Sequence, residues 1–268
     1  MIVISSSVVL AQAEAAVTAN NPRIGYHSVI TSSNIAADEE ADDEPVTNLA
    51  NPATYLSWRG TSTSEQTVSI SLGEATDVDY FAIAKHNLGS TGATVAFEYS
   101  EDGETWTTVE TIEPSSDYAL IVEFDSVSSQ FFRLNILPGT AAPAIAVLYV
   151  GEILPLQRRI YVGHTPFTYG RKSSISNGRS ESGQFLGRVL RREYRESSVS
   201  LQNITPSWYR SKMEPFVEAA RTRPYFWAWR PQQYPSEVGY AWMTGDLQVS
   251  NQLPNGFMQL SFSMQGIR

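Results

Sequence analysis

The sequence predicts a mainly β protein, in which an antiparallel jelly-roll sandwich precedes a second β-rich domain with one helix. Short apolar segments recur at intervals of about ten residues from Val68 to Val150, with turn residues between them. Such even spacing is typical of sandwiches and jelly rolls. No amphipathic helix of ordinary length is expected in that half, and the charge of the chain changes sign near residue 150. The 268 residues are enough for two domains of roughly 100–200 residues each.

The expected strands of the first domain follow from their apolar patterns. Val68–Leu72 alternates apolar and polar residues, as a half-buried strand does, and Asp79–Ala84 has the composition of a more buried strand. Thr94–Tyr99 alternates again, and Asp102-Gly103 is a strong hairpin signal before Thr105–Val109. The remaining strands are expected at 120–124, 131–136 and 144–150.

We place the domain boundaries at residues 45 and 150. Residues 1–45 are expected to form an N-terminal strand or arm and an acidic loop, residues 46–150 the jelly roll, and residues 151–268 the second domain. The first 30 or so residues are expected to pair with the second domain, because Ile2–Ile4 and Val8–Leu10 are strand-like. The first residues lack the basic region of a signal peptide, which favours an ordered arm over a cleaved leader. The acidic run 38–45 matches no EF-hand spacing, which favours a solvated loop over a calcium site.

The second domain has a mixed pattern. Ile160–Val162 and Val199–Gln202 are expected strands, and the Ser-, Gly- and Arg-rich stretch Arg171–Arg188 between them is expected to be an extended or mobile loop. Thr205 is a candidate N-cap for a helix from Trp208 to about Arg221, in which Pro215 produces a kink or marks the first turn. Further strands are expected at 224–229, 240–243, 246–249 and 257–264.

Charge differs sharply between the two halves of the chain. Residues 1–150 hold 20 Asp/Glu and 4 Lys/Arg, a net charge of −16, whereas residues 151–268 hold 8 Asp/Glu and 15 Lys/Arg, a net charge of +7. Only two of the 15 cations are lysines, and they form no polybasic run, so no nucleic-acid specificity is expected. Arginine suits planar pairing at protein interfaces. We therefore name Arg188, Arg191, Arg192 and Arg195 as a candidate subunit interface, with solvated edge-strand charges as the alternative.

The sequence contains no motif that is typical of catalysis or metal binding. It contains no cysteine, and His27, His86 and His164 have no histidine or acidic partner at ligand spacing. No nucleophile-elbow, P-loop, zinc-protease or dinucleotide motif is present. We therefore expect no enzyme activity, catalytic residue, cofactor or metal, and the lack of a run of 18 apolar residues argues against membrane insertion.

The aromatic side chains allow two interpretations, a packed core or an exposed platform for sugar. Burial is favoured because large aromatic residues dominate cores and interfaces. The residues in question are Trp58, Trp106, Tyr225, Phe226, Trp227 and Trp229.

Two resemblances add to these observations. The segment 99–106, with the sequence YSEDGETW, and the later 132–136, FRLNI, resemble the pattern of discoidin or galactose-binding-like jelly rolls. In that fold Trp106 packs beneath the Asp-Gly turn and Arg133 faces a carboxylate across strands. The resemblance implies the fold and leaves the ligand open, because such domains bind sugars, lipids, proteins or nothing.

The second resemblance spans nearly the whole chain. The segments 21–26, 48–58, 82–89, 183–188 and 223–231 occur in an order similar to that of tail proteins of long-tailed phages. This resemblance implies a virion structural protein of the tail tip or baseplate, made in the host cytoplasm. It also implies a homo-oligomeric ring that joins the tail tube to the tip, with tube and hub proteins as neighbours.

Three functions therefore compete at this stage. The leading hypothesis is the ring-forming tail protein. The alternative is a carbohydrate-binding module that attaches to host-surface glycan, and a glycan-active enzyme is the third. An exposed aromatic and polar surface on the jelly roll would favour glycan binding, whereas convergent carboxylates in a cleft would favour the enzyme.

Overall fold

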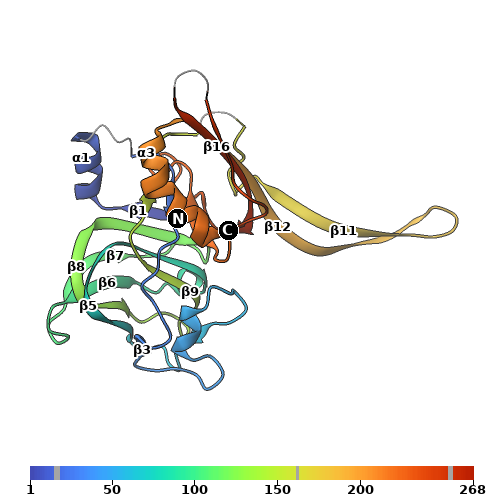
Figure 1. Ribbon diagram of the computed structural model, residues 1–268. Helices are drawn as coiled ribbons and strands as arrows, with labels where there is room; N and C mark the ends of the chain where they lie inside the picture. Colours follow the sequence, from blue (N-terminus) through green and yellow to red (C-terminus); the bar gives the residue numbers. More distant parts are fainter. Residues whose placement is uncertain (15–18, 161–162, 253–255) are drawn as a thin grey trace.

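The computed structural model describes residues 1–14, 19–160, 163–252 and 256–268, and it confirms the mainly β fold. Two antiparallel sheets lie side by side, and a long two-stranded hairpin projects from the second (Figure 1). The first sheet consists of β1 (Ile2–Ile4), β3 (Ile35–Ala37), β4 (Trp58–Arg59), β5 (Gln66–His86), β6 (Val95–Ser100), β7 (Thr107–Ile112), β8 (Leu120–Ile136) and β9 (Ala144–Gly151).

Long strands fold the first sheet onto itself. Strands β5 and β8 pair along two separate stretches, with register shifts between Ser71 and Thr76 and between Val78 and Tyr80. Strands β3, β6 and β7 therefore extend one layer, and β1, β4 and β9 extend the other. The apolar side chains between the layers form a single core, which gives the jelly-roll sandwich that the sequence predicts.

The Asp-Gly turn between β6 and β7 forms where the sequence predicts it. Gly103 has φ +76°, in the left-handed region that favours glycine. The Asp102 carboxylate accepts hydrogen bonds from the amides of Glu104 and Thr105, both at 2.8 Å. These bonds lower the pKa of Asp102 to about 2, so the turn keeps its negative charge.

The second sheet carries the hairpin and packs against the jelly roll. It consists of β2 (Arg23–Gly25), β10 (Leu154–Pro155), β11 (Arg171–Arg179), β12 (Phe185–Ile204), β13 (Tyr225–Ala228), β14 (Val238–Met243), β15 (Gln248–Asn251) and β16 (Met258–Ile267). Strand β9 is buried along its whole length because one face meets the jelly-roll core and the other meets Phe226 and Tyr240 of the second sheet.

Short helical segments connect the strands. They are α1 (Ser6–Glu14), η1 (Val46–Ala50), α2 (Leu88–Thr91), α3 (Pro206–Trp208), η2 (Tyr209–Met213) and α4 (Glu214–Ala220). The last three form one continuous helical stretch after Thr205, which confirms the helix predicted there. Pro215 lies at the start of α4, directly after the π-helical segment η2, so its missing N–H falls where the hydrogen-bonding pattern of the stretch changes.

Three expectations about the chain are wrong. Ile2–Ile4 pairs in parallel with β8 of the first sheet, so of the described residues up to 30 it is β2 (Arg23–Gly25) that pairs with the second sheet. Val8–Leu10 lies inside α1, because the surrounding Ala, Gln and Leu favour a helix and the Ser5 hydroxyl accepts a hydrogen bond from the Val8 amide. The stretch 171–188 is not a loop but most of the β11–β12 hairpin. The strand expected at 160–162 falls partly on residues 161–162, which lie outside the described residues.

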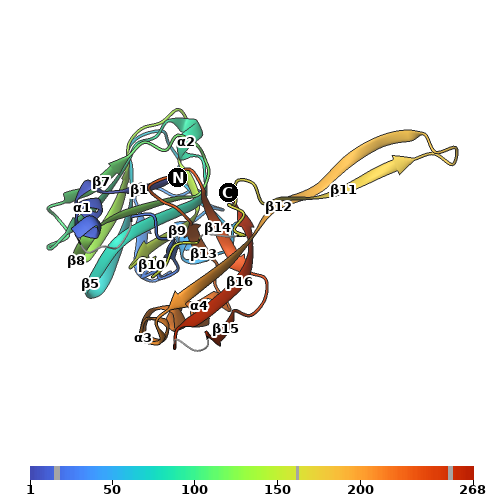
Figure 2. The same cartoon turned by 90° about the horizontal axis from the view of Figure 1, so that it is seen from above.

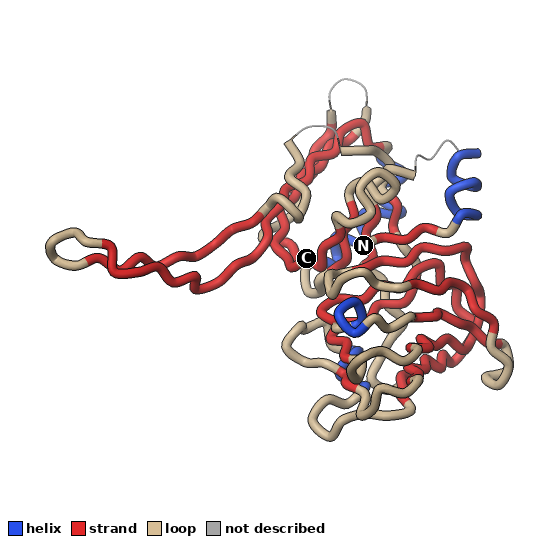
Figure 3. Tube along the Cα trace, turned by 180° about the vertical axis from the view of Figure 1, so that it is seen from behind, coloured by secondary structure: helices blue, strands red, loops and turns tan. Residues whose placement is uncertain are grey.

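The domain boundaries at 45 and 150 stay a prediction about independently folding units. Strands β1 and β2 come from the same N-terminal segment but join different sheets. The tube view shows the two chain termini close to one another, where the two parts of the molecule meet (Figure 3).

Candidate functional site

A network of polar side chains joins two loops of the jelly roll, residues 38–44 and 57–66. Trp58 anchors the network, since its side chain is fully buried and its indole N–H donates to the Glu39 carbonyl at 3.0 Å. Glu44 accepts hydrogen bonds from Arg59 and from the Ser57 hydroxyl, and these two bonds, with that from Arg59 the larger, hold the pKa of Glu44 below its usual range. The loops therefore present ionised carboxylates and an arginine at the surface.

A second carboxylate in the same network is Glu39. It accepts a hydrogen bond from the Thr61 hydroxyl, and the Gln66 amide donates to it at 3.1 Å. The hydrogen bond from Thr61, followed by one from Ser62, lowers the pKa of Glu39. Hydrogen-bonding groups of this kind, fixed by a buried anchor, are what a polar ligand requires.

Tyr55 stands beside this network, in the loop between η1 and β4. Its side chain is 82% exposed and makes no ring contact among the described residues. The other exposed aromatic side chain of the jelly roll, Tyr118, is covered by the Arg268 guanidinium at 4.3 Å from the ring centre. Tyr55 is thus the uncovered aromatic face of this domain within the described residues, and with loops 38–44 and 57–66 it defines what we call the Tyr55 loops.

The aromatic residues weighed in the sequence are mostly buried, as predicted. Trp106 lies under the Arg133 guanidinium at 4.2 Å, and Arg133 forms an ion pair with Glu98 across the strands. Trp229 is partly buried and stacks on Tyr234 with ring centres 5.4 Å apart. Fully buried are Trp58, Tyr225, Phe226 and Trp227. None of this group offers a free aromatic platform.

The three histidines lie in separate places. Burial lowers the pKa values of His86 and His164, whose rings hydrogen-bond to the Tyr118 and Ser198 carbonyls. His27 lies against β5, where the Tyr80 hydroxyl donates to its carbonyl. In the described part of the chain, no three His, Asp or Glu side chains are grouped in a way that could hold a metal ion. Nor do the described helices include one with the length and apolar character needed to span a membrane.

The predicted interface arginines lie on the β11–β12 hairpin, which projects away from both sheets (Figure 2). Arg188, Arg191 and Arg192 are exposed along it. Arg195 differs, because it sits at the base of the hairpin, where its guanidinium donates to the Thr168 carbonyl at 2.9 Å. The hairpin also exposes large apolar side chains that are not among the predicted interface residues: Ile175, Phe185, Leu186, Val189 and Leu190.

Comparison of the sequence with known protein families agrees with the topology of the first sheet. Residues 28–147 match the family model described as the F5/8 type C domain. Residues 28–147 are an F5/8 type C domain. This domain begins before residue 46, consistent with the pairing of β3 and β5. It is a discoidin-like, galactose-binding-like jelly roll, which confirms that part of the first resemblance.

Several solved structures are similar to the F5/8 type C domain. A Clostridium perfringens carbohydrate-binding module in complex with GalNAc-β-1,3-galactose is 17% identical, with a TM-score of 0.41, and the match covers 45% of this chain and 97% of that one. The family 32 module of C. perfringens NanJ, in complex with galactose, is 20% identical over 46% of this chain and 97% of that one, with a TM-score of 0.40. A chitosan-binding module from Paenibacillus sp. IK-5 is 13% identical over 47% and 99%, with a TM-score of 0.42. Comparison with curated proteins gave no match.

Tyr55 and the apolar residues of the hairpin are the features that sequence reasoning missed. Tyr55 belongs to a loop without apolar periodicity, so no pattern separates it from a buried aromatic residue. In the hairpin, the signal was the pair of apolar dipeptides at 185–186 and 189–190, which stand among serines and arginines.

Proposed function

We propose that the protein is a structural attachment protein whose F5/8 type C domain binds carbohydrate through the Tyr55 loops, without a catalytic step. The exposure of Tyr55, two residues before the Ser57 that hydrogen-bonds to the Glu44 of the Glu44–Arg59 pair, carries the proposal. A sugar ring has apolar C–H faces and polar hydroxyl edges, which a free aromatic face and neighbouring charged hydrogen-bonding groups complement. The galactose-binding-like fold of the domain supports the same reading.

A glycan array tests this proposal with the intact protein. We expect wild-type protein to bind a defined subset of glycans, and Tyr55→Ala to lose that binding by tenfold or more. Tyr169→Ala is the matched control, because Tyr169 is also a highly exposed tyrosine but lies in the other sheet region. Equal binding by wild type and Tyr55→Ala, at equal melting temperatures, would refute the assignment of the site.

A second candidate function is the ring-forming tail-tip protein, and the projecting hairpin specifically favours it. Such a hairpin is poorly stabilised by its own chain, since isolated two-stranded ribbons are marginal in water, and exposed apolar residues on it suit contact with another subunit. In this proposal the protein belongs to the virion tail, with tube and hub proteins as neighbours. Electron microscopy of purified protein and of isolated tails tests it: rings or tip density are expected, and monomers with no tail density would exclude it.

A further inference from the structure

The β11–β12 hairpin, which we call the arm (residues 171–195), has apolar side chains on both faces. Leu190 is directly opposite Ile175, and Val189 is opposite Ser176. Opposite residues of an antiparallel pair share a face, and successive residues alternate between faces. Leu190 and Val189, both more than half exposed, therefore point to opposite sides of the ribbon. Neither side is covered by the described part of the chain, so a partner would have to contact both.

The arm is also strongly basic. Residues 171–195 hold seven Lys/Arg and two Asp/Glu. Arg171 and Arg195 share Glu193 near the base, at 3.2 and 3.4 Å. The arginines further out, Arg188, Arg191 and Arg192, have no carboxylate partner among the described residues. The arginines without a carboxylate partner thus lie in the same stretch as the exposed apolar side chains. Their positive charge favours an acidic partner.

One end of the jelly roll supplies a surface of opposite charge. Ser71 and Ser100 both pair with Phe131, and Thr76 pairs with Ser129 beyond the register shift, so the segments 72–77, 101–106 and 125–130 meet at the same end of the jelly roll. These segments contain no Lys or Arg. The nearest cation, Arg133, is already paired with Glu98. We call this surface the acidic end; its exposed carboxylates belong to Glu74, Asp77, Glu101, Asp102, Glu104 and Asp125.

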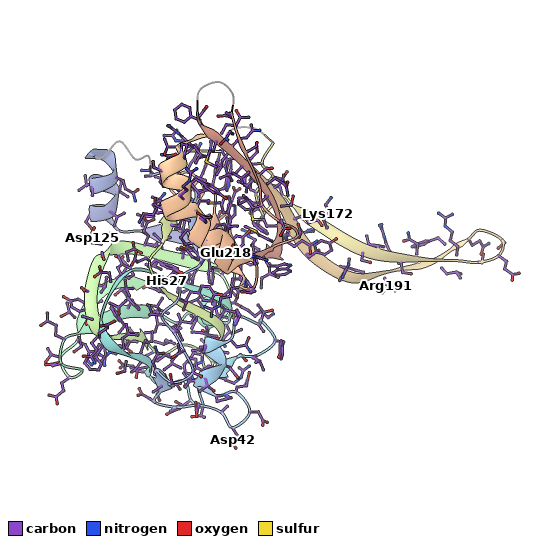
Figure 4. All side chains as sticks on the ribbon, viewed as in Figure 1. His27, Asp42, Asp125, Lys172, Arg191 and Glu218 are labelled. Carbon is purple, nitrogen blue, oxygen red and sulfur yellow. The ribbon has the colours of Figure 1, made fainter. Side chains whose placement is uncertain are left out.

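The arm and the acidic end lie on opposite sides of the molecule. Figure 4 labels Arg191 on the projecting hairpin and Asp125 at the far side of the jelly roll. A chain cannot bring these two surfaces together by itself. When complementary surfaces face opposite directions, copies associate head to tail, and the contact closes into a ring or continues as a filament.

We infer that the arm of one copy docks on the acidic end of the next copy's jelly roll. The carboxylates of the acidic end pair with Arg188, Arg191 and Arg192, and burial of the apolar side chains of the arm supplies most of the binding free energy. The inference deepens the second candidate function and rests on the oligomer that it proposes. This docking contact does not involve the Tyr55 loops, which lie after β3 and around β4 and not in the segments that form the acidic end.

A charge-swap experiment tests the inference by sedimentation velocity on the full chain. The arm variant carries Arg188→Glu, Arg191→Glu and Arg192→Glu, and the acidic-end variant carries Glu101→Lys, Glu104→Lys and Asp125→Lys. A control variant makes the same charge change at exposed carboxylates outside both the acidic end and the Tyr55 loops: Glu113→Lys, Asp117→Lys and Glu218→Lys. Melting temperatures of all variants verify that each remains folded.

We expect wild type and control to form species larger than a dimer at low salt, and to dissociate as salt rises. Each charge variant alone should be monomeric. An equimolar mixture of the two should form alternating oligomers, because the reversed arm meets the reversed acidic end at one contact and the wild-type arm meets the wild-type acidic end at the next. A chain carrying all six substitutions should assemble again. Oligomers that persist in both single variants would overturn the inference but not the structural role. A wild-type monomer at all salt concentrations would overturn both, while glycan binding, measured on monomers, would remain separately testable.

Discussion

The Arg23 Nε lies 2.9 Å from the Glu123 Oε2, and both side chains are almost completely buried where the second sheet meets the jelly roll. Arg23 belongs to β2 and Glu123 to β8, so the pair joins the two sheets. Gln12 of α1 completes the arrangement, donating to Glu123 at 3.0 Å and accepting from Arg23 at 2.8 Å. A buried charge without its partner is strongly destabilising, so this pair ties the packing of the two sheets to the N-terminal helix.

Arg23→Met should lower the free energy of unfolding by roughly 3–5 kcal/mol, because Glu123 would remain buried without its cation. The control is Arg59→Met, which breaks the exposed ion pair with Glu44 and should change stability by about 0–1 kcal/mol. Urea denaturation measures both. The double variant Arg23→Met, Glu123→Leu should recover much of the loss, and equal destabilisation by Arg23→Met and Arg59→Met would contradict this account.

The contribution of Asp79 to stability should fall as pH rises from about 4 to 7. Burial, together with the nearby Glu123 and Glu152, raises the pKa of Asp79 to about 7, despite the hydrogen bond that its carboxylate accepts from the Ile153 amide at 2.7 Å. The unfolded chain ionises this group near pH 3.9. The folded state therefore binds the proton more tightly, and its contribution to stability is present at low pH and lost through pH 7.

Asp79→Asn removes this ionisation and retains an oxygen for the Ile153 amide. We expect it to be more stable than wild type by roughly 1–3 kcal/mol at pH 8, after allowing for the partial exposure of the group, and we expect this difference to shrink as pH falls from 8 to 5. Asp77→Asn, an exposed neighbour, should leave the pH profile unchanged. Thermal melts across this range provide the comparison, and parallel profiles for wild type and Asp79→Asn would disprove the effect.

Trp227→Ala should destabilise the protein by roughly 3–5 kcal/mol, since the side chain is fully buried and its ring contacts Phe262 edge to face at 6.1 Å between centres. Trp229→Ala should have a smaller effect. Trp229 is only partly buried, and the ring on which it stacks, that of Tyr234, is exposed. Calorimetric melts of the two variants would decide, and a larger loss for Trp229→Ala would reverse this ranking.

Polar substitutions in the arm should leave folding intact. Replacing Phe185, Leu186, Val189 and Leu190 by Thr changes exposed positions only, so the stability should stay within about 0.5 kcal/mol of wild type per site. Val199→Ala, further along the same strand but buried, should cost roughly 2 kcal/mol. A cooperative loss of stability in the arm variant would mean that the arm packs on its own chain.

Local patterns in the sequence were sufficient for the jelly roll. The alternation at Val68–Leu72 reflects one buried face of β5. Asp102-Gly103 specifies the turn between β6 and β7, through the conformation of the glycine and the hydrogen bonds of the aspartate side chain. The arm was mistaken for a loop because its Ser-, Gly- and Arg-rich strands have no buried face in this chain, so the usual apolar alternation is missing. The Arg23–Glu123 pair joins residues 100 positions apart, and no local pattern identifies such a contact.

The most direct test of the central claim is to map glycan binding onto the chain by NMR chemical-shift perturbation, with a sugar selected on the array. We predict that the perturbed amides cluster at residues 38–44 and 51–66, around Tyr55, and that Tyr55→Ala abolishes the shifts while the spectrum of the second sheet stays unchanged. Perturbations confined to the acidic end or to the second sheet, or a lack of any shift with a sugar that binds on the array, would contradict the carbohydrate site proposed for the F5/8 type C domain.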